Sequence, residues 1–234
     1  HTGKDAYLHE PLHPLPYFPV GPCAAPLDRN AKTLCYTSAA VDADYRILGD
    51  GKATVFLSCT AADTDVMMSL VDVSPDGRRF IICDGATRAR YRMDWISRPL
   101  TPNEIYTVEV ELGRICYTLR AGHRLRLVIT GSAFPKYDVN HGTGQRPIQD
   151  AQTVTSTTNV YYGPSYPHGQ KHELKRREPH HCFRIGLPQR RVEKNRKGNR
   201  YETNCCVDLD PGASDYVRGC FGRAGGSHDC RTCN

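Results

Sequence analysis

The sequence predicts an all-β protein whose main domain is a two-sheet β-sandwich or a jelly roll. Short apolar segments rich in β-branched residues, about ten of them, are separated by turn-forming residues. Before residue 168, no segment of useful length has the 3.6-residue period of an amphipathic helix. Strands do not alternate with helices, as they would in an α/β fold. We therefore expect two antiparallel sheets packed face to face.

Composition divides the chain into three regions. Residues 1–30 are rich in His, Pro and Gly without a period, and we expect an extended linker there. Residues 31–167 carry the predicted jelly roll. Residues 168–234 hold 14 Lys and Arg against 8 Asp and Glu, so the whole net charge of +6 lies in this part. Because this basic tail has few apolar residues and no sustained period, we expect it to be mostly disordered.

The first strands of the jelly roll are expected at residues 34–38, 45–48 and 52–60. In the third of these, Ala53, Val55, Leu57 and Cys59 alternate with more polar residues, as in a strand with one buried face.

The central stretch, residues 63–92, predicts three strands joined by tight turns. A strand at Val66–Val73 is followed by Ser74–Gly77, where Pro and Gly favour a turn. A second strand at Phe80–Cys83 is expected to turn again at Asp84–Gly85 into a third at Thr87–Arg92. The result would be an antiparallel meander.

The later strands show the clearest alternation. Tyr106–Leu112 alternates apolar residues with Thr and Glu, and Arg124–Thr130 alternates Leu and Ile with Arg. Further strands are expected at residues 115–120 and 153–162, with a long polar loop at 133–146.

The cysteines and the hydropathy profile bear on the cellular compartment. Five cysteines before residue 168 lie singly in apolar runs, and we expect buried free thiols in a reducing, cytoplasmic compartment. No run of about 18 apolar residues exists, so no spanning helix and no membrane partner are expected. Because the chain begins with His1, we expect a fragment or a processed product. The five cysteines are Cys23, Cys35, Cys59, Cys83 and Cys116.

Five stretches, at residues 37–59, 63–92, 99–112, 121–144 and 152–167, carry a family resemblance. In their order and spacing they resemble the C-terminal β-sandwich of X-Pro dipeptidyl-peptidases and of cocaine-esterase-like (CocE/NonD) serine hydrolases. The resemblance implies a galactose-binding-like jelly roll, packed on an α/β-hydrolase domain that carries a Ser-His-Asp triad.

This family resemblance also implies what the chain contributes. The jelly roll would help to shape and cover the active site, where peptides or esters are cleaved, while the α/β-hydrolase domain is missing from this chain. Whether the chain is itself an enzyme stays open. After Pro167 the family pattern would finish with a short strand containing Leu and Pro. The change to a basic, Cys-rich sequence at His168 instead indicates a frameshift, a fusion or a mispredicted exon.

Three residues were considered for catalysis, and none is assigned. Ser165 lies in Gly163–Gly169, which imitates a nucleophile elbow, but no apolar helix follows it. Ser214 lacks both the strand and the helix. His123 could act as a general base, yet it is better explained as a turn residue before a core strand. We therefore expect no catalytic residue in this chain.

Two polar groups could bind ligands. The first combines aspartates near strand ends with alternating arginines, and we favour ion pairs within the domain or between domains over a ligand site. The second is the loop 138–144, which could bind calcium, although Lys136 and His141 argue against an oxygen cage. The first group consists of Asp65, Asp84, Arg88, Arg90 and Arg92.

The tail carries cysteines and basic runs. Its single C-x-x-C motif lacks a second pair at zinc-finger spacing, so we expect no metal and no cofactor. The runs at 171–177 and 190–200 have few interleaved aromatic residues and are interpreted as solvated, without a nucleic-acid partner. The cluster considered for zinc comprises Cys205, Cys206, Cys220, His228, Cys230 and Cys233.

An alternative function is a free-standing jelly-roll module that binds carbohydrate or another small ligand. Such a module needs an exposed aromatic platform. Trp95 is the only tryptophan, with Tyr91 close by, so the sequence offers little for one.

Overall fold

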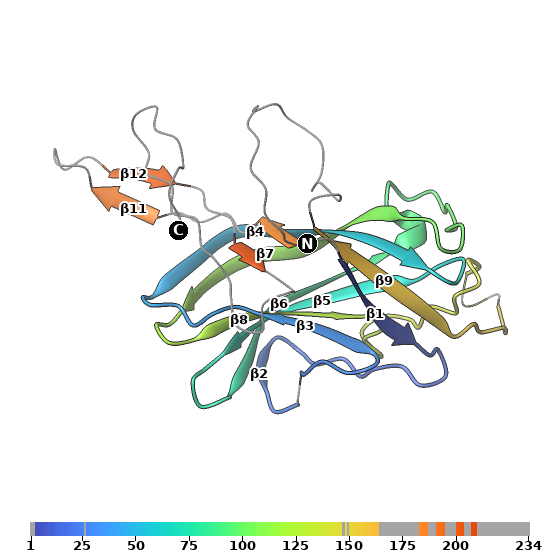
Figure 1. Cartoon of the computed structure of the whole chain (residues 1–234), viewed down its shortest axis with the longest axis horizontal. Coiled ribbons are helices and arrows are strands. Elements are labelled where there is room, and N and C mark those ends of the chain that lie inside the picture. Colours follow the sequence, from blue (N-terminus) through green and yellow to red (C-terminus); the bar gives the residue numbers. More distant parts are fainter. Residues whose placement is uncertain are drawn as a thin grey trace.

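A computed structural model describes residues 3–25, 27–146, 148 and 150–163, together with the backbone of four short strands between residues 183 and 209. The main body consists of nine strands and one 3-10 turn, η1 (Ala89–Tyr91), arranged in two layers (Figure 1). The strands are β1 (Gly3–His9), β2 (Gly21–Cys23), β3 (Thr33–Thr37), β4 (Tyr45–Cys59), β5 (Asp65–Val73), β6 (Arg79–Arg88), β7 (Tyr106–Leu119), β8 (Arg124–Thr130) and β9 (Ser156–Tyr162).

The strand pairing is nested, and this nesting makes the fold a jelly roll. The inner pair β5–β6 is enclosed by β4–β7, then by β3–β8 and finally by β1–β9, all antiparallel. One sheet runs β1-β9-β4, with β7 on the other side of β4, and the second runs β2-β6-β5-β8-β3. The predicted jelly-roll sandwich is confirmed.

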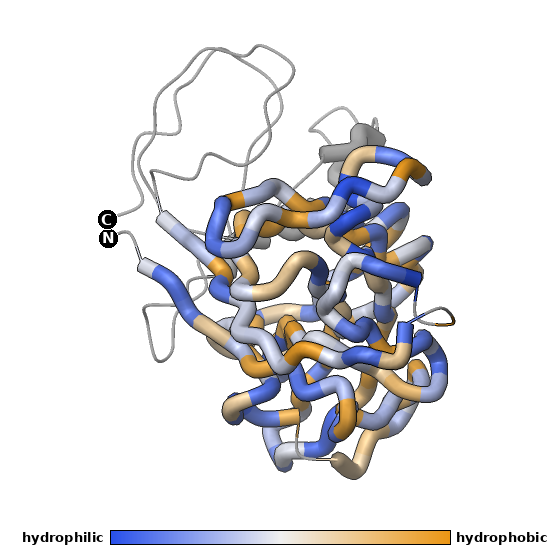
Figure 2. The backbone as a smooth tube through the Cα atoms, turned by 90° about the vertical axis from the view of Figure 1, so that its right-hand side faces the viewer, coloured by the Kyte–Doolittle hydropathy of each residue, from blue (hydrophilic) through white to orange (hydrophobic). Residues whose placement is uncertain are grey.

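The core forms where the strands alternate between apolar and polar residues. Ala53, Val55, Leu57 and Cys59 on β4 are each at most 2% exposed, as their alternation predicts. On β7 and β8 the predicted inward positions are buried as well, except for Tyr106, which is half-buried. Hydrophobic and hydrophilic positions alternate along the tube in Figure 2.

Residues 1–30 differ from the linker that composition predicts. Residues 3–9 form β1, whose partner β9 lies some 150 residues further along the chain (Gly3 pairs with Tyr162), and residues 21–23 form β2 against β6. The expectation of no elements is therefore wrong, because hydrogen bonding to a distant strand supplies what the short local pattern lacks. The division of the chain at residues 30 and 167 stays a prediction.

The central stretch differs from the predicted meander. Asp84 and Gly85 do not turn the chain, since β6 continues through them to Arg88 and only the hairpin β5–β6 forms. A Cβ atom at Gly85 would lie 1.9 Å from the carbonyl oxygen of Glu111 on β7. Gly85 therefore lies within strand β6 at a point where the two sheets approach closely, and it does not form a turn.

Two pairs of predicted strands are joined. Residues 45–48 and 52–60 belong to one bent strand, β4, and residues 106–112 and 115–120 to its partner β7. A register shift between Gly51 and Lys52 lies opposite Gly113, whose φ is +76°. Such a bulge bends both strands without ending them, so the glycines that resemble turns in the sequence lie within strands.

The tail contains β10 (Phe183–Gly186), β11 (Arg191–Lys194), β12 (Arg200–Thr203) and β13 (Val207–Leu209). β10 pairs with β4, where Ile185 lies opposite Ala53. These strands differ from the disorder predicted for residues 168–234. The rest of the tail, with its proposed cysteine cluster and most of its basic runs, lies outside the described residues.

The sandwich has two ends of different character. The register puts the end of β1, the start of β5, the end of β6 and the start of β9 at one end, which we call the loop end. It carries the connections 10–15, 60–64, 89–105 and 131–155, gathered at the right of Figure 1. The opposite end, the turn end, carries the short connections 38–44, 74–78 and 120–123.

Candidate functional site

The loop end is built around an ion pair between β5 and β6, in which Asp65 is buried and Arg88 is half-buried. Asp65 starts β5 and lies opposite Arg88, the last residue of β6. The Arg88 guanidinium donates two hydrogen bonds to the Asp65 carboxylate, at 2.8 and 2.9 Å. Asn140, from the loop before β9, donates to the same carboxylate at 2.7 Å. The Asp65 charge is therefore fully partnered inside the domain.

A second ion pair lies beside the first. The Arg90 backbone N–H donates to Asp63 at 3.0 Å, and its guanidinium Nε lies 3.5 Å from the other Asp63 oxygen. Both side chains are at most 3% exposed. Burial, helped by the neighbouring Asp65 charge, raises the pKa of Asp63 to about 6, while Asn140 and Arg90 oppose this rise. Desolvation disfavours the carboxylate form more than these partners favour it.

These two ion pairs hold the loops together. Arg88 donates to the Asp138 carbonyl at 2.9 Å, and Arg90 donates to the Gln145 carbonyl. We call the set Asp63, Asp65, Arg88, Arg90 and Asn140 the clamp, because it ties the connections around residues 63, 90 and 140 to one another.

Of the predicted polar constellation, the structure brings Asp65, Arg88 and Arg90 together and leaves two members elsewhere. Asp84 pairs with Lys136, and Arg92 lies over the ring of Tyr106 at 4.3 Å.

Sequence reasoning missed two members of the clamp, Asp63 and Asn140, whose side chains are 3.0 Å apart. The only signal was that Asp63 lies two residues before Asp65 and that Asn140 lies in the loop considered for calcium. That loop offers no free cage, since the Asn140 side-chain oxygen accepts from Gly142 N–H at 2.8 Å. In the described part of the chain, no group of three or more His, Cys, Asp or Glu residues is arranged to hold a metal.

His123 lies at the turn end, far from the clamp. Its Nδ1 is 2.7 Å from an oxygen of Asp72, whose other oxygen accepts from the Tyr117 hydroxyl at 2.7 Å. Among the described residues, no serine or cysteine hydrogen-bonds to His123. The structure thus places this histidine in a local polar network before β8. Ser165 and Ser214 lie outside the described residues.

The cysteines upstream of residue 168 are free thiols, as predicted, but not all are buried. Cys59 and Cys83 are buried, Cys23 and Cys35 are half-buried, and Cys116 is exposed, so the expectation of burial is wrong for Cys116. Cys116 alternates with inward-facing residues on β7, which turns it to solvent. Burial raises the pKa of Cys83 to about 12 and that of Cys35 to about 11, which keeps both thiols protonated and unreactive at neutral pH.

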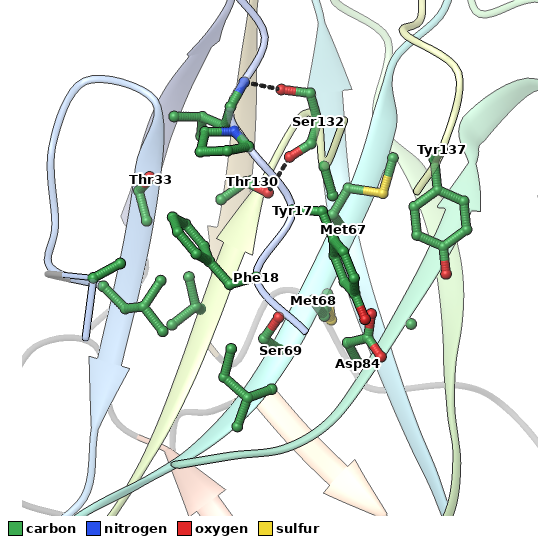
Figure 3. A pocket seen from close by; sticks show the side chains of 18 of the residues that line it. Tyr17, Phe18, Thr33, Met67, Met68, Ser69, Asp84, Thr130, Ser132 and Tyr137 are labelled. Carbon is green, nitrogen blue, oxygen red and sulfur yellow. Dashed lines mark hydrogen bonds between the residues drawn. The ribbon is translucent and has the colours of Figure 1, made fainter. Parts of the chain in front are cut away.

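A cavity of about 210 Å³ lies on the outer side of the second sheet, under the segment around residues 15–18 (Figure 3). Apolar side chains such as Phe18 and Met67 line most of it, and Tyr17 reaches toward Asp84 at one side. Among the described residues two serines, Ser69 and Ser132, belong to the lining, together with the carboxylate of Asp84 but without a histidine or cysteine. Asp84 is paired with Lys136, and the serines of the described lining have no histidine beside them to act as a general base.

The surface of the loop end is unusually apolar. In the described part of the chain ten large hydrophobic side chains are exposed, and eight of them belong to loop-end connections. The other two, Val20 and Phe80, lie at β2 and β6. The eight are Leu12, Met93, Trp95, Ile96, Ile105, Phe134, Ile148 and Val154.

A nested jelly roll whose loops are joined by a clamp of ion pairs defines a β-sandwich domain. The particular family follows from comparison with known proteins. The model of the X-Pro dipeptidyl-peptidase C-terminal non-catalytic domain matches residues 3–169, and the chain belongs to this family.

Individual relatives agree with this assignment. The cocaine esterase of Rhodococcus sp. (strain MB1 Bresler) is 32% identical over 176 residues, which cover 70% of this chain and 31% of that enzyme. An aminopeptidase from a marine sediment Thaumarchaeota archaeon (TM-score 0.64, 23% identity) and an α-amino acid ester hydrolase (TM-score 0.63, 24% identity) share the fold. Each match covers 68% of this chain and 31% or 30% of the solved one. The chain thus spans about a third of the length of these relatives.

The described part of the chain contains no helix with the length and apolar character needed to cross a bilayer.

Proposed function

We propose that this chain is the C-terminal β-sandwich of an X-Pro dipeptidyl-peptidase or CocE-type serine hydrolase, and that it shapes the active site of an α/β-hydrolase domain in the same polypeptide. The observation that carries the proposal is the concentration of exposed apolar side chains at the loop end. Contiguous exposed apolar surface is typical of sites where another protein surface packs. The 32% identity with a cocaine esterase supports the kind of partner.

The chemistry would reside in the partner domain. A Ser-His-Asp triad with an oxyanion hole transfers the acyl group of an ester or peptide substrate to water. The residues of this chain would contribute a rigid wall, because the clamp fixes the loops that carry the apolar surface. No catalytic residue, metal or cofactor is assigned to this chain, and neither a membrane nor a nucleic acid is proposed as its partner. The free thiols favour a cytoplasmic location.

A second candidate is a free-standing module that binds carbohydrate or another small ligand. Trp95 is 94% exposed and could serve as an aromatic platform. Sugar recognition also needs polar side chains around such a ring to bind the hydroxyl groups. The large neighbours of Trp95 are the apolar Met93 and Ile96, and the carboxylate of Asp94 is paired with Arg98. The docking role therefore fits this surface better.

The first experiment is to sequence the coding DNA through the codons for His1 and His168. We expect an in-frame upstream hydrolase domain with a G-x-S-x-G motif. The encoded polypeptide should hydrolyse an aryl-ester or Gly-Pro reporter, whereas the 234-residue chain should not. A start codon directly before His1 would overturn the proposal and favour the binding module. Turnover by the 234-residue chain that survives Ser165→Ala would overturn it as well.

A further inference from the structure

We propose that the segment 92–98, between η1 and β7, is the anchor by which this domain docks: Trp95, flanked by Met93 and Ile96, inserts into an apolar pocket of the α/β-hydrolase domain of the same polypeptide. The inference rests on the proposed function and adds to it the surface, the leading residue and the chemistry of the contact.

The exposure of the three side chains is the first support. Met93, Trp95 and Ile96 are 74%, 94% and 62% exposed, although they are among the largest apolar residues of the chain. Burying side chains of this size is favourable, so leaving all three in water gives up a large part of the free energy that a partner surface would recover. Tryptophan is also the residue type most enriched among the side chains that dominate protein–protein binding energy.

The segment is closed at its base, so it can present these side chains in a fixed position. The Arg98 N–H donates to the Arg90 carbonyl at 2.8 Å. The Arg92 guanidinium donates to the Ala89 carbonyl at 3.1 Å and to the Arg98 carbonyl at 2.7 Å. One arginine thus bridges the two ends of the segment. Its cation also lies over the Tyr106 ring, which holds it in place.

The opposite charges of Asp94 and Arg98 are paired within the segment. Arg98 pairs with Asp94 at 2.5 and 3.0 Å, and the Ile96 N–H donates to the same carboxylate at 2.8 Å. These bonds leave Met93, Trp95 and Ile96 as the large outward groups. A partner that covers them needs apolar surface and no unpaired charge.

The base of the segment is continuous with the clamp. Arg90, whose carbonyl closes the segment, is 2% exposed and is bound through its backbone and side chain to Asp63. An apolar group on a rigid support loses little conformational entropy on binding, so more of its burial energy appears as affinity. This arrangement favours a permanent internal interface over a transient contact.

The partner that covers Trp95 is inferred from the length of the relatives and from the apolar chemistry of the exposed surface. In the cocaine esterase, about two thirds of the enzyme lies outside the part that matches this chain. Under the proposed function, the corresponding part of this polypeptide is the hydrolase domain. We expect that domain to supply the apolar surface that covers Trp95. A second copy of this chain or a sugar remains an outcome of the test.

Trp95 is the only tryptophan of the chain, which makes the test direct. The 234-residue chain and the full-length polypeptide are labelled with 5-fluorotryptophan, and a soluble paramagnetic agent is added. In the 234-residue chain the single fluorine resonance should broaden strongly. In the full-length polypeptide the Trp95 resonance, identified as the one missing after Trp95→Phe, should be protected.

Hydrogen exchange of the amides in residues 93–98 measures how strongly Trp95 contributes to docking. Removal of a dominant interface side chain costs about 2 kcal/mol or more, so Trp95→Ala should reduce their protection in the full-length polypeptide about 30-fold. Val20→Ala, which removes an exposed apolar side chain away from the loop end, is the matched control and should leave the protection unchanged. Trp95→Ala should not change the stability of the 234-residue chain.

The outcomes separate this inference from the proposed function. A Trp95 resonance that stays accessible in a full-length polypeptide with hydrolase activity would overturn the anchor and leave the proposed function intact. If the Trp95 resonance were protected from the paramagnetic agent only in the 234-residue chain, because that chain self-associates or binds an added sugar, the hydrolase domain would not be the partner of Trp95. Absence of any upstream hydrolase domain would overturn the proposed function itself.

Discussion

The two ends of the sandwich distribute charge and apolar surface in opposite ways. At the loop end three charged side chains of the clamp are buried and the fourth, Arg88, is half-buried, while eight large apolar side chains face solvent. At the turn end the ion pairs Asp44–Arg120 and Asp76–Arg78 are exposed. Soluble domains usually follow the second arrangement. The inversion at the loop end marks the surface that another part of the polypeptide is expected to cover.

The inversion has a physical reason. Long loops lack the ladder of hydrogen bonds that fixes a strand, so their order must come from side chains. Buried ion pairs supply it, because each charged group loses its hydration and must find its partners inside the protein. The connections at the turn end are short and need only a Pro-Gly turn or a capped backbone N–H. Rigidity of the loop end therefore depends on a few residues.

The largest expected effect comes from breaking the clamp. Asp65→Ala should lower the free energy of unfolding by about 3–5 kcal/mol, because it leaves the largely buried Arg88 guanidinium without its carboxylate. Denaturant unfolding of the 234-residue chain measures this loss. Arg78→Ala, which breaks the exposed pair with Asp76 at the turn end, is the control and should cost far less. Equal losses would remove the energetic distinction between the two ends.

Asp63 in the clamp should also respond to pH with a sign opposite to that of the exposed carboxylates Asp44 and Asp76 at the turn end. The pKa of Asp63 is raised from 3.8 to about 6, so the folded chain holds a proton that the unfolded chain releases between these values. Its contribution to stability should therefore fall as pH rises through this window, by up to about 3 kcal/mol. Carbon-13 detection of the Asp63 carboxyl measures the titration. A midpoint at or below 3.8 would contradict the prediction.

At the turn end, hydrogen bonds to the carboxylates act the other way. The Ala121 N–H lowers the pKa of Asp44, and the Ser74 hydroxyl lowers that of Asp76. Their stabilising contribution is present above the unfolded pKa and is lost as pH falls through the lowered folded pKa. The same carbon-13 titration observes these groups and provides the internal control for Asp63.

A smaller effect is expected for a partly buried hydrogen bond near the turn end. Tyr117→Phe removes the hydroxyl that donates to Asp72 at 2.7 Å but keeps the ring stacked on Phe80. Loss of a hydrogen bond to a charged group should cost about 1.5–3 kcal/mol. Thermal and denaturant unfolding measure this change. No change would show that water replaces the hydroxyl, and that Asp72 is less enclosed than its burial indicates.

The sequence could predict what is local and periodic. The alternation on β4, β7 and β8 predicts both the strands and their buried faces, and five family-like stretches in order predict the jelly roll. Gly85 shows the limit of local reasoning. Asp-Gly is a strong turn signal, but here the glycine is required by Glu111 on the other sheet, and nothing near it in the sequence indicates that contact.

The candidate site was harder to predict because its parts are distant in the chain. Asp65 and Arg88 belong to the predicted ion-pair constellation, because Asp65 lies near a predicted strand end and Arg88 is one of a run of alternating arginines. Asn140, which binds Asp63 from 77 residues away, could not be found from periodicity. The outward position of Trp95 could not be predicted from the local sequence pattern either. It depends on the hydrogen bonds that Arg92 makes across the base of the segment.

The smallest effect is expected where an exposed ion pair is removed. Arg120→Ala breaks the pair with Asp44, whose side chains are 67% and 49% exposed, while the Asp44 carboxylate keeps its bond to the Ala121 N–H. Solvent and salt screen such a pair, so the loss should be about 0–1 kcal/mol and should shrink further at high salt. Denaturant unfolding at low and high ionic strength measures both. A salt-independent loss as large as that of Asp65→Ala would mean that the turn end also depends on fixed charge pairs, and the contrast between the ends would then lie in apolar exposure alone.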